Sequence, residues 1–294
     1  MIFENIIGNE KNKKLLNQII SMNNIAHSYM FIGKESIGKM LFAKEFAKAI
    51  LCINDSKPCG KCKSCIEFES SNNPDFEIIE PDGNSIKIEQ IRELIKKVYE
   101  KPIVSNKKVY IINDSNLMTK EAQNSLLKTL EEPPEYVSII LIASNENLFL
   151  PTIKSRCTKI MFKKLTDNEL KTILKKKYNK LNIQELVLKI ADGSVNKAEC
   201  LDGKEELYNK VNRIYSSLEN VNIIKLINSK EDIFKDKEQA IEMLEYINLI
   251  FFDKITSNSN YIECMKIVED TKDMTIDNLN MTVWEVINGK YYRS

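Results

Sequence analysis

Residues 33–40 read Gly-Lys-Glu-Ser-Ile-Gly-Lys-Met, and this stretch decides the predicted fold. The apolar run 29–32 precedes it, and a helical pattern over residues 41–50 follows it. A strand, a glycine-rich turn and a helix, in that order, form the loop that binds nucleotide phosphates in the pattern G-x-x-x-x-G-K-[ST]. Backbone N–H groups, the positive end of the helix and one lysine attract the phosphates. The residues that match this pattern are Gly33, Gly38 and Lys39, so the sequence predicts an α/β domain with a phosphate-binding type of loop.

Two positions depart from the pattern of an active ATPase. Met40 stands where a serine or threonine hydroxyl would bind Mg²⁺. The predicted strand that begins at residue 108 ends in Asn113 and Asp114, where such ATPases place an aspartate and then a glutamate. Asparagine carries no charge to hold the cation, and aspartate is one methylene shorter than glutamate. Because both departures fall on the metal, the sequence favours a chain that does not hydrolyse ATP, and it leaves phosphate binding open.

The carboxyl end of a second predicted strand adds another candidate binding residue. Residues 137–143 form a continuous apolar run, as in a central parallel strand that is buried on both faces. Ser144 follows this run, and ligands bind at the carboxyl ends of strands in open α/β sheets. We therefore predict that Asp114 and Ser144 border the same binding site as the glycine-rich loop.

Four cysteines lie close together after the helix that follows the loop: Cys52, Cys59, Cys62 and Cys65. Four thiolates at this spacing suit the tetrahedral coordination of Zn²⁺. Because four ligands close the coordination shell, the pattern favours a structural zinc knuckle over a redox Cys-x-x-Cys, which is the alternative interpretation.

Composition limits the classes of function. The 43 basic and 42 acidic side chains give a net charge of +1, which predicts no general attraction to nucleic acid. No apolar run approaches the ~20 residues of a membrane span, and the N-terminal residues lack the pattern of a signal peptide. We expect a cytoplasmic protein without membrane contacts, in which clustered cysteines bind metal rather than form disulfides.

The pattern predicts three domains: residues 1–164 with the knuckle at 52–65, a small helical lid over 165–204, and an all-helical collar over 205–294. Thr166 and Glu169 form a capping-box pattern that begins the lid. Residues 240–252 read as a strongly apolar helix of the collar. Three aromatic residues near the end are predicted to anchor contacts with sister subunits: Trp284, Tyr291 and Tyr292.

Two further motifs carry a family resemblance. Residues 124–134, Asn-Ser-Leu-Leu-Lys-Thr-Leu-Glu-Glu-Pro-Pro, and residues 155–157, Ser-Arg-Cys, resemble bacterial clamp-loader AAA+ subunits of the DNA polymerase III holoenzyme. The cysteine insertion fits the same family. The resemblance implies an AAA+ fold, with a parallel sheet between flanking helices, a helical lid and an all-α collar that joins the subunits of a ring.

The resemblance also implies roles for individual residues. The family contains an active ATPase motor and a related subunit with a degenerate site, and Met40 and Asn113 make this chain more similar to the second. Asn196 stands where the family has a second-domain arginine in a Gly-Ser-x-Arg context, which removes another charge. In these rings the Ser-Arg-Cys arginine is presented to the ATP of a neighbouring subunit, so the resemblance makes Arg156 a trans arginine finger. The alternative for Arg156 is an ordinary salt-bridged surface residue.

The function implied is that of a hydrolysis-incompetent subunit in DNA replication. Its partners would be the gamma/tau ATPase subunit and the delta subunit in a hetero-pentamer, which loads the sliding clamp on primed DNA. One alternative is an active AAA+ ATPase of the gamma/tau type, which would use Lys39; ATP binding itself is left open. The other is a zinc-knuckle nucleic-acid-binding protein, supported by Lys57, Lys61 and Lys63 between the cysteines.

Overall fold

The computed structural model describes residues 2–178, 185–200, 205–215 and 237–254, together with residues 262, 265, 266, 268–270 and 272. The chain divides into two compact units. The first contains Met1–Ile183 and Asp192–Asn196, and the second contains Gln184–Ala191 and Lys197–Ser294. This division differs from the three predicted domains, whose boundaries stay predictions.

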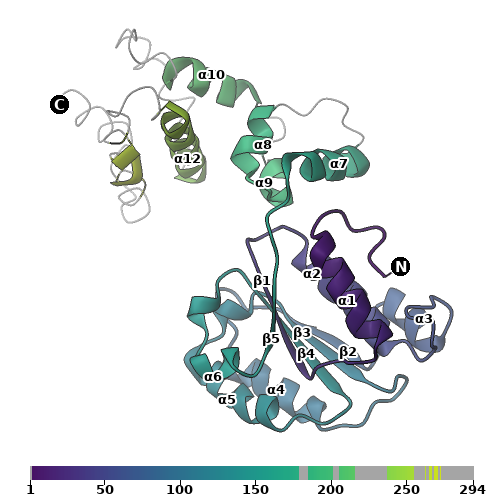
Figure 1. Ribbon diagram of the computed structural model, residues 1–294. Helices are drawn as coiled ribbons and strands as arrows, with labels where there is room; N and C mark the ends of the chain where they lie inside the picture. The colour runs from purple at the N-terminus through teal and green to yellow at the C-terminus, as the bar shows by residue number, and fades with distance from the viewer. Residues whose placement is uncertain are drawn as a thin grey trace. The chain divides into compact units, whose positions relative to one another are not determined.

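A five-stranded parallel sheet forms the centre of the first unit, in the order β2-β3-β4-β1-β5 (Figure 1). The strands are β1 (Ser28–Ile32), β2 (Phe76–Ile79), β3 (Lys108–Ile112), β4 (Val137–Ala143) and β5 (Thr158–Met161). Every residue of β1, β3 and β4 is buried, as expected for central strands of a parallel sheet. The predicted strand over residues 137–143 is therefore confirmed, and so is the α/β fold class.

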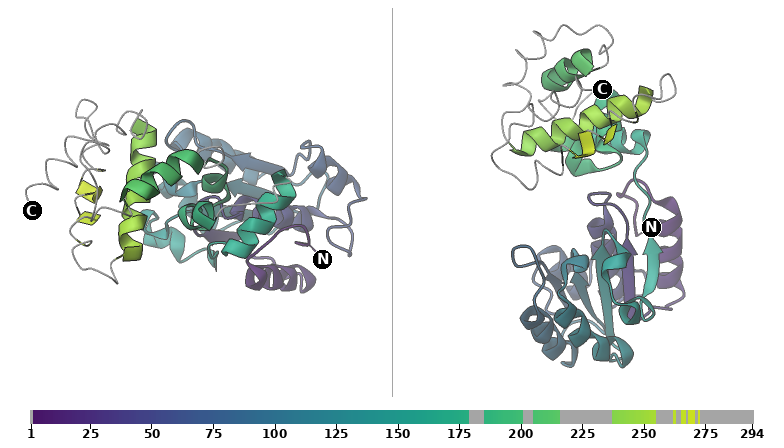
Figure 2. Two further views of the ribbon diagram at one scale, coloured as in Figure 1. Left: turned by 90° about the horizontal axis from the view of Figure 1, so that it is seen from above. Right: turned by 90° about the vertical axis from the view of Figure 1, so that its left-hand side faces the viewer.

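Helices cover both faces of this sheet (Figures 1 and 2). One face carries α1 (Glu10–Ser21) and α2 (Lys39–Leu51), and the other carries α4 (Ile88–Val98) and α5 (Lys120–Glu131). Alternate side chains of β1 point to opposite faces. Tyr29 and Phe31 belong to the same buried core as Phe46 of α2, whereas Met30 belongs to the core that contains Leu126 of α5. The two apolar cores fix the sheet between two helical layers.

The remaining elements of the first unit are short, apart from the last one. They are α3 (Lys63–Glu69), the 3-10 helices η1 (Ser115–Leu117) and η2 (Glu146–Leu148), α6 (Pro151–Lys154) and α7 (Asp167–Tyr178). The capping box before α7 is confirmed: the Thr166 N–H donates to Glu169 Oε2 at 2.8 Å, and the Glu169 N–H donates to Thr166 Oγ1 at 3.3 Å.

The second unit is helical in its described residues, which include α8 (Glu185–Ala191), α10 (Glu205–Tyr215) and α12 (Lys237–Lys254). A further short helix, α9 (Val195–Cys200), begins in the first unit. Tyr208 of α10 packs edge-on against Tyr246 of α12, with ring centroids 4.8 Å apart. The Tyr208 hydroxyl donates to Glu242 at 2.6 Å, so a polar contact accompanies the apolar packing. The predicted helix over residues 240–252 lies within α12.

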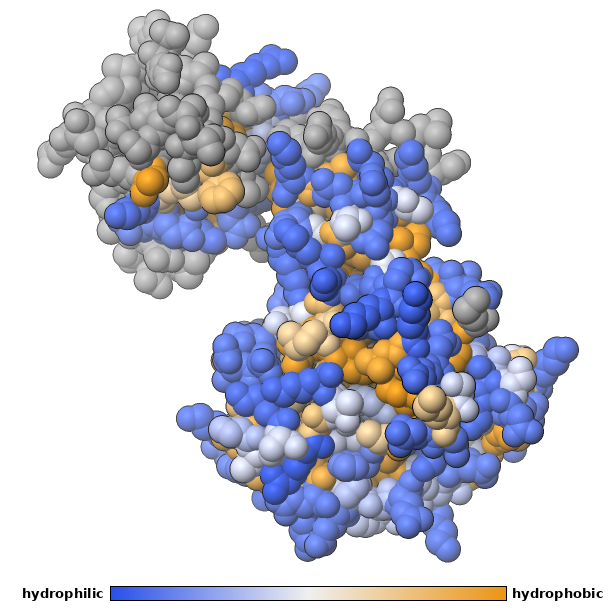
Figure 3. All heavy atoms as spheres, in the orientation of Figure 1, coloured by the Kyte–Doolittle hydropathy of each residue, from blue (hydrophilic) through white to orange (hydrophobic). Residues whose placement is uncertain are grey.

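Three predicted interface residues, Trp284, Tyr291 and Tyr292, lie outside the described residues. Their role as anchors of the collar stays a prediction. On the visible face of the described residues, hydrophilic side chains cover much of both units, and a continuous apolar area is exposed on the first unit (Figure 3).

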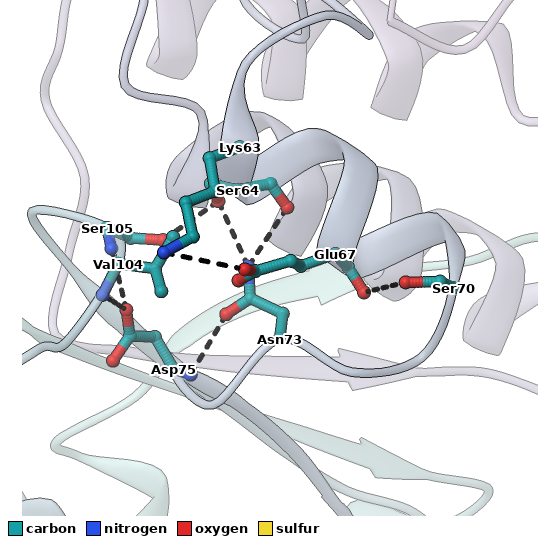
Figure 4. A network of polar contacts seen from close by, with 8 residues as sticks. All are labelled: Lys63, Ser64, Glu67, Ser70, Asn73, Asp75, Val104 and Ser105. Atoms are coloured by element: carbon teal, nitrogen blue, oxygen red, sulfur yellow. Dashed lines mark hydrogen bonds and ion pairs between the residues drawn. The ribbon is translucent and has the colours of Figure 1, made fainter.

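A buried polar network joins α3 to the segment that leads into β3 (Figure 4). The Asp75 carboxylate, which is 0% exposed, accepts the backbone N–H groups of residues 103, 104 and 105 at 2.7–2.8 Å. The Asn73 amide donates to the Ser64 carbonyl at 3.0 Å, and the Ser64 and Ser105 hydroxyls lie 2.8 Å apart. Because a buried carboxylate needs donors, these contacts hold the segment in one conformation.

We expect Asp75→Ala to lower the free energy of unfolding by about 3 kcal/mol, because three backbone donors lose a charged acceptor. Asp75→Asn keeps one acceptor oxygen and is expected to lose less. Urea unfolding followed by circular dichroism measures both values. Asp82→Ala is the control, because Asp82 is an exposed carboxylate whose ion pair with Lys87, at 3.3 Å, contributes under about 1 kcal/mol. Equal stability of Asp75→Ala and the control would contradict the expected role.

Candidate functional site

The glycine-rich loop, residues 33–38, lies between the carboxyl end of β1 and the first turn of α2. The Gly33 N–H donates to the Ala143 carbonyl at 3.1 Å, which places the loop beside the end of β4. A Cβ on Gly33 would lie 2.6 Å from the Phe162 carbonyl oxygen, so a larger residue does not fit. Gly38 occupies the position before α2 with a φ of 94°, a conformation that favours glycine. The helix N-terminus therefore faces the loop, as phosphate binding requires.

Lys39 is turned inward onto the loop. Its ammonium donates to the carbonyl of Gly33 and to that of Lys34, the latter at 2.6 Å, and the residue is 6% exposed. Burial lowers the pKa of Lys39, although the nearby charges of Asp114 and Glu35 act in the opposite direction. The two carbonyls compete with any phosphate oxygen for the Lys39 ammonium. The charge of Asp114 acts on Lys39, and the role of both residues in phosphate binding stays a prediction.

Met40 and Asn113 stand where an active ATPase of this type binds Mg²⁺. Their contacts in this structure explain both departures from the ATPase pattern. Met40 packs against the core on the α1 and α2 face of the sheet, so its thioether fills apolar space. The Asn113 amide donates to Glu80 at 2.9 Å and to Asp114 at 3.2 Å. The amide N–H groups already donate to the two negatively charged carboxylates, so this arrangement disfavours a cation between them. No pattern in the sequence singles out Glu80, which lies 33 residues away from Asn113 along the chain.

Ser144 lies at the end of β4, beside the loop. Its N–H donates to the Asn116 side chain at 3.1 Å, which ties β4 to η1 after β3. The sequence analysis did not single out Asn116, because one asparagine in a turn carries no distinctive pattern.

Asp192 joins the loop to the residues before α9. Its carboxylate pairs with Lys34 at 2.5 Å and with Lys164 at 2.6 Å. Burial would raise the pKa of Asp192, but hydrogen bonds from Lys164 and Lys34 outweigh it and lower the pKa. The Val195 N–H also donates to the Ser36 carbonyl at 3.0 Å. These contacts hold the loop, and Asp192 competes with any phosphate for the Lys34 ammonium.

Asn196 and Lys197 lie close to this junction in the sequence. Asn196 is exposed, and it stands where the resemblance places an arginine. The ammonium of the adjacent Lys197 pairs with Glu245 at 3.4 Å.

The four cysteines meet at the far end of α2 from the loop. The sulfur atoms of Cys52, Cys59, Cys62 and Cys65 all lie within 4.8 Å of one another, and Cys52 Sγ is 4.0 Å from Cys62 Sγ. A Zn²⁺ ion with sulfur ligands at about 2.3 Å requires separations of about 3.8 Å, so the group fits this ion closely. Cys52 follows the last residue of α2, about 20 Å from its first turn. A metal held here would be remote from the loop.

Electrostatics of the cysteine group also favour a cation. Backbone N–H groups of Lys61 and Cys62 donate to Cys59 Sγ and lower the pKa of Cys59 to about 6. Burial instead raises the pKa of Cys52, and it raises that of Cys65 to about 12. Several thiolates in one buried site repel one another unless a cation neutralises them. The fold therefore assembles a group that is suited to a metal but costly to ionise without one.

Arg156 lies directly after α6, and its side chain is 31% exposed. Nη2 pairs with Glu131 Oε1 at 2.6 Å, and Nη1 donates to the Thr152 carbonyl at 2.8 Å. The Arg156 carbonyl accepts the Ser28 hydroxyl at 2.6 Å, which fixes the backbone against the start of β1. The arginine is thus salt-bridged in this chain, and its role as a trans finger stays a prediction.

Comparisons with known proteins agree with this fold and these motifs. The chain is similar to DNA polymerase III subunit delta' of Bacillus subtilis, at 40% identity over 153 residues, which are 52% of this chain and 46% of the relative. It is also similar to DNA polymerase III subunit tau/gamma of Haemophilus influenzae, at 36% identity over 171 residues, 57% of this chain and 25% of the relative. The matches thus span under half the length of these two relatives.

A solved structure supports the fold alone. The crystal structure of a DNA polymerase III gamma subunit-related protein from Thermotoga maritima has a TM-score of 0.51 at 20% identity, and the match covers 95% of this chain and 99% of that one. The likeness confirms the predicted AAA+ class of fold, with its parallel sheet and flanking helices.

In the part of the chain that the structure describes, no helix is long and apolar enough to cross a membrane. The model of the family described as "DNA polymerase III, delta subunit" matches residues 8–166, more than half of the 294 residues. The chain therefore belongs to this family of DNA polymerase III clamp-loader proteins.

Proposed function

We propose that this chain is a delta prime (delta') type of clamp-loader subunit that does not hydrolyse ATP and lends Arg156 to a neighbouring ATPase subunit. The observation that carries the proposal is the state of the metal side of the loop. Met40 is partly buried and packs against the core, and the Asn113 amide donates to both Glu80 and Asp114. Phosphoryl transfer needs a cation that neutralises the developing charge, and neither the Met40 thioether nor this amide donor is suited to hold it.

The place and chemistry of Arg156 support the second half of the proposal. Its backbone is fixed by the contact with Ser28, while the guanidinium end remains partly exposed. A guanidinium is planar and permanently charged, so it can bind two oxygens of a phosphate at once. A fixed backbone and a partly exposed side chain, which is paired with Glu131, suit a finger directed at another subunit.

We further propose the partners that the relatives' names suggest. These are the gamma/tau ATPase subunit and the delta subunit in a hetero-pentamer that loads the sliding clamp on primed DNA in the cytoplasm. The assembly would use the collar over residues 205–294, with the lid over 165–204 between it and the domain over 1–164. The four-cysteine group would hold one structural Zn²⁺, which would cross-link the segment between α2 and α3.

Nucleotide binding is a separate part of the proposal. We propose that phosphates bind at Gly33, Gly38 and Lys39, with Asp114 and Ser144 at the border of the site. The ammonium groups of Lys39 and Lys34 already donate to two acceptors each within the chain, and these acceptors compete with phosphate oxygens. We therefore expect binding of ATP to be weak and independent of Mg²⁺.

We expect the purified chain to show no Mg²⁺-dependent ATP turnover above that of Lys39→Ala, because the metal ligands are missing. Phosphate release by the two proteins, with and without primed DNA, measures this. Turnover by the unaltered chain that disappears in Lys39→Ala would contradict the proposal and establish the active-ATPase alternative. Met40→Thr combined with Asn113→Asp is the matched gain-of-ligand variant, which tests whether the metal site alone limits hydrolysis.

A further inference from the structure

The ion pair between Arg156 and Glu131 bears on how a finger at this position would be controlled. Glu131 is the last residue of α5, and Arg156 lies 25 positions later, after α6. The Nη2–Oε1 distance is 2.6 Å, which is that of a short charge-assisted hydrogen bond. Nη1 is occupied as well, because it donates to the Thr152 carbonyl at 2.8 Å and reaches the Ser155 hydroxyl at 3.4 Å. Both terminal nitrogens of the guanidinium therefore already have acceptors within this chain.

Different interactions hold the two residues of this ion pair, Arg156 and Glu131, in place. The backbone of Arg156 is fixed at its N–H by the Ile153 carbonyl, at 3.1 Å, and at its carbonyl by Ser28. The direction of the guanidinium is therefore set by its side-chain contacts. Glu131 lies at the C-terminal end of a helix, where the partial negative charge of the backbone carbonyls disfavours a second negative group. The positive charge of Arg156 relieves this repulsion, which stabilises the contact between the carboxylate and the guanidinium.

We infer that Glu131 is a positioning residue that holds Arg156 against its own subunit and competes with the terminal phosphate of a neighbouring subunit's nucleotide. The inference rests on the proposed role of Arg156 as a trans finger. A phosphate oxygen and the Glu131 carboxylate are both anionic acceptors for the same guanidinium, so the two compete for it. If Glu131 kept its place beside the bound nucleotide, it would also repel the phosphate.

The solvent exposure of Arg156 and Glu131 limits how strongly their ion pair can compete with a phosphate. The side chains of Arg156 and Glu131 are 31% and 46% exposed, so water screens their attraction. Exposed ion pairs shift an equilibrium by about two- to fivefold, far less than the effect of a finger on turnover. Glu131 therefore slows the engagement of Arg156 with the phosphate in complexes that are not stimulated by DNA. It does not prevent this engagement once the neighbouring subunit's site closes.

The test uses the assembled complex with Glu131→Gln, which keeps the shape of the side chain and removes its charge. We expect ATP turnover without DNA to rise about two- to fivefold and the KM for ATP to fall by a similar factor. The kcat with primed DNA and clamp is expected to stay within twofold of the unaltered complex. Glu132→Gln is the matched control, since it removes the same charge from the next residue, which is also exposed.

A double variant separates this role from a structural one. In an Arg156→Ala background, Glu131→Gln should change neither KM nor turnover, because the competing guanidinium is gone. Glu131→Gln indistinguishable from the unaltered complex, or an effect that persists in the Arg156→Ala background, would overturn the inference while leaving the finger intact. Reduced DNA-stimulated turnover in Glu131→Gln would also overturn it, since the carboxylate would then assist the finger. Arg156→Ala without any effect would overturn the proposed function and this inference together.

Discussion

Replacing Arg156 with alanine is expected to lower ATP turnover at the neighbouring subunit's site by about a thousandfold, the lower end of the range for arginine fingers. The loss arises because the guanidinium would no longer stabilise charge that develops on the transferring phosphoryl group. The fold itself should be nearly unaffected. The side chain makes an exposed ion pair with Glu131, which contributes under about 1 kcal/mol, and the backbone contact with Ser28 does not depend on it.

The measurement is steady-state turnover by the assembled complex with primed DNA and clamp, in parallel with this chain alone. Arg156→Lys keeps the charge and loses the planar fork, so it should recover a small part of the turnover. Lys154→Ala removes a nearby positive charge from α6 and should leave turnover within twofold of the unaltered complex. An Arg156→Ala complex as active as the unaltered one, at equal subunit content, would refute the trans finger.

Removing the metal from the cysteine group is expected to have the largest effect on stability. We predict one Zn²⁺ per chain and loss of that ion in Cys62→Ser. Structural zinc sites in small peptides contribute about 10 kcal/mol or more at neutral pH. Here the sheet and its two cores persist without the ion, so we expect local unfolding of the segment between α2 and α3 at a cost of several kcal/mol.

Metal analysis of freshly purified protein and hydrogen exchange over residues 52–69 measure the two parts of this prediction. Cys157→Ser is the matched control, because Cys157 is buried at 8% exposure yet lies outside the cysteine group. The control should keep its zinc even if its melting temperature falls. A chain that contains no zinc when purified without chelators, or Cys62→Ser with unchanged exchange, would contradict a structural metal.

Local patterns in the sequence determined much of the first unit. The continuous apolar run over residues 137–143 coincides with β4, and the Thr166–Glu169 capping box forms as expected. The four cysteines also meet, because three of them lie within seven residues, which limits how far apart their sulfur atoms can be. These features depend on periodicity, caps and short loops, whose physical causes act within a few residues.

Only the tertiary structure decided how the candidate site is held. The sequence showed that Met40 and Asn113 depart from an ATPase pattern, but not that Met40 joins an apolar core or that Asn113 binds Glu80. Contacts of Lys34 with Asp192 and of Arg156 with Glu131 were equally hidden. Each joins residues that are at least 25 positions apart, and a charged residue has many potential partners of opposite charge along the chain. The packing of strands and helices, which depends on the whole apolar core, selects among those partners, so local sequence patterns cannot.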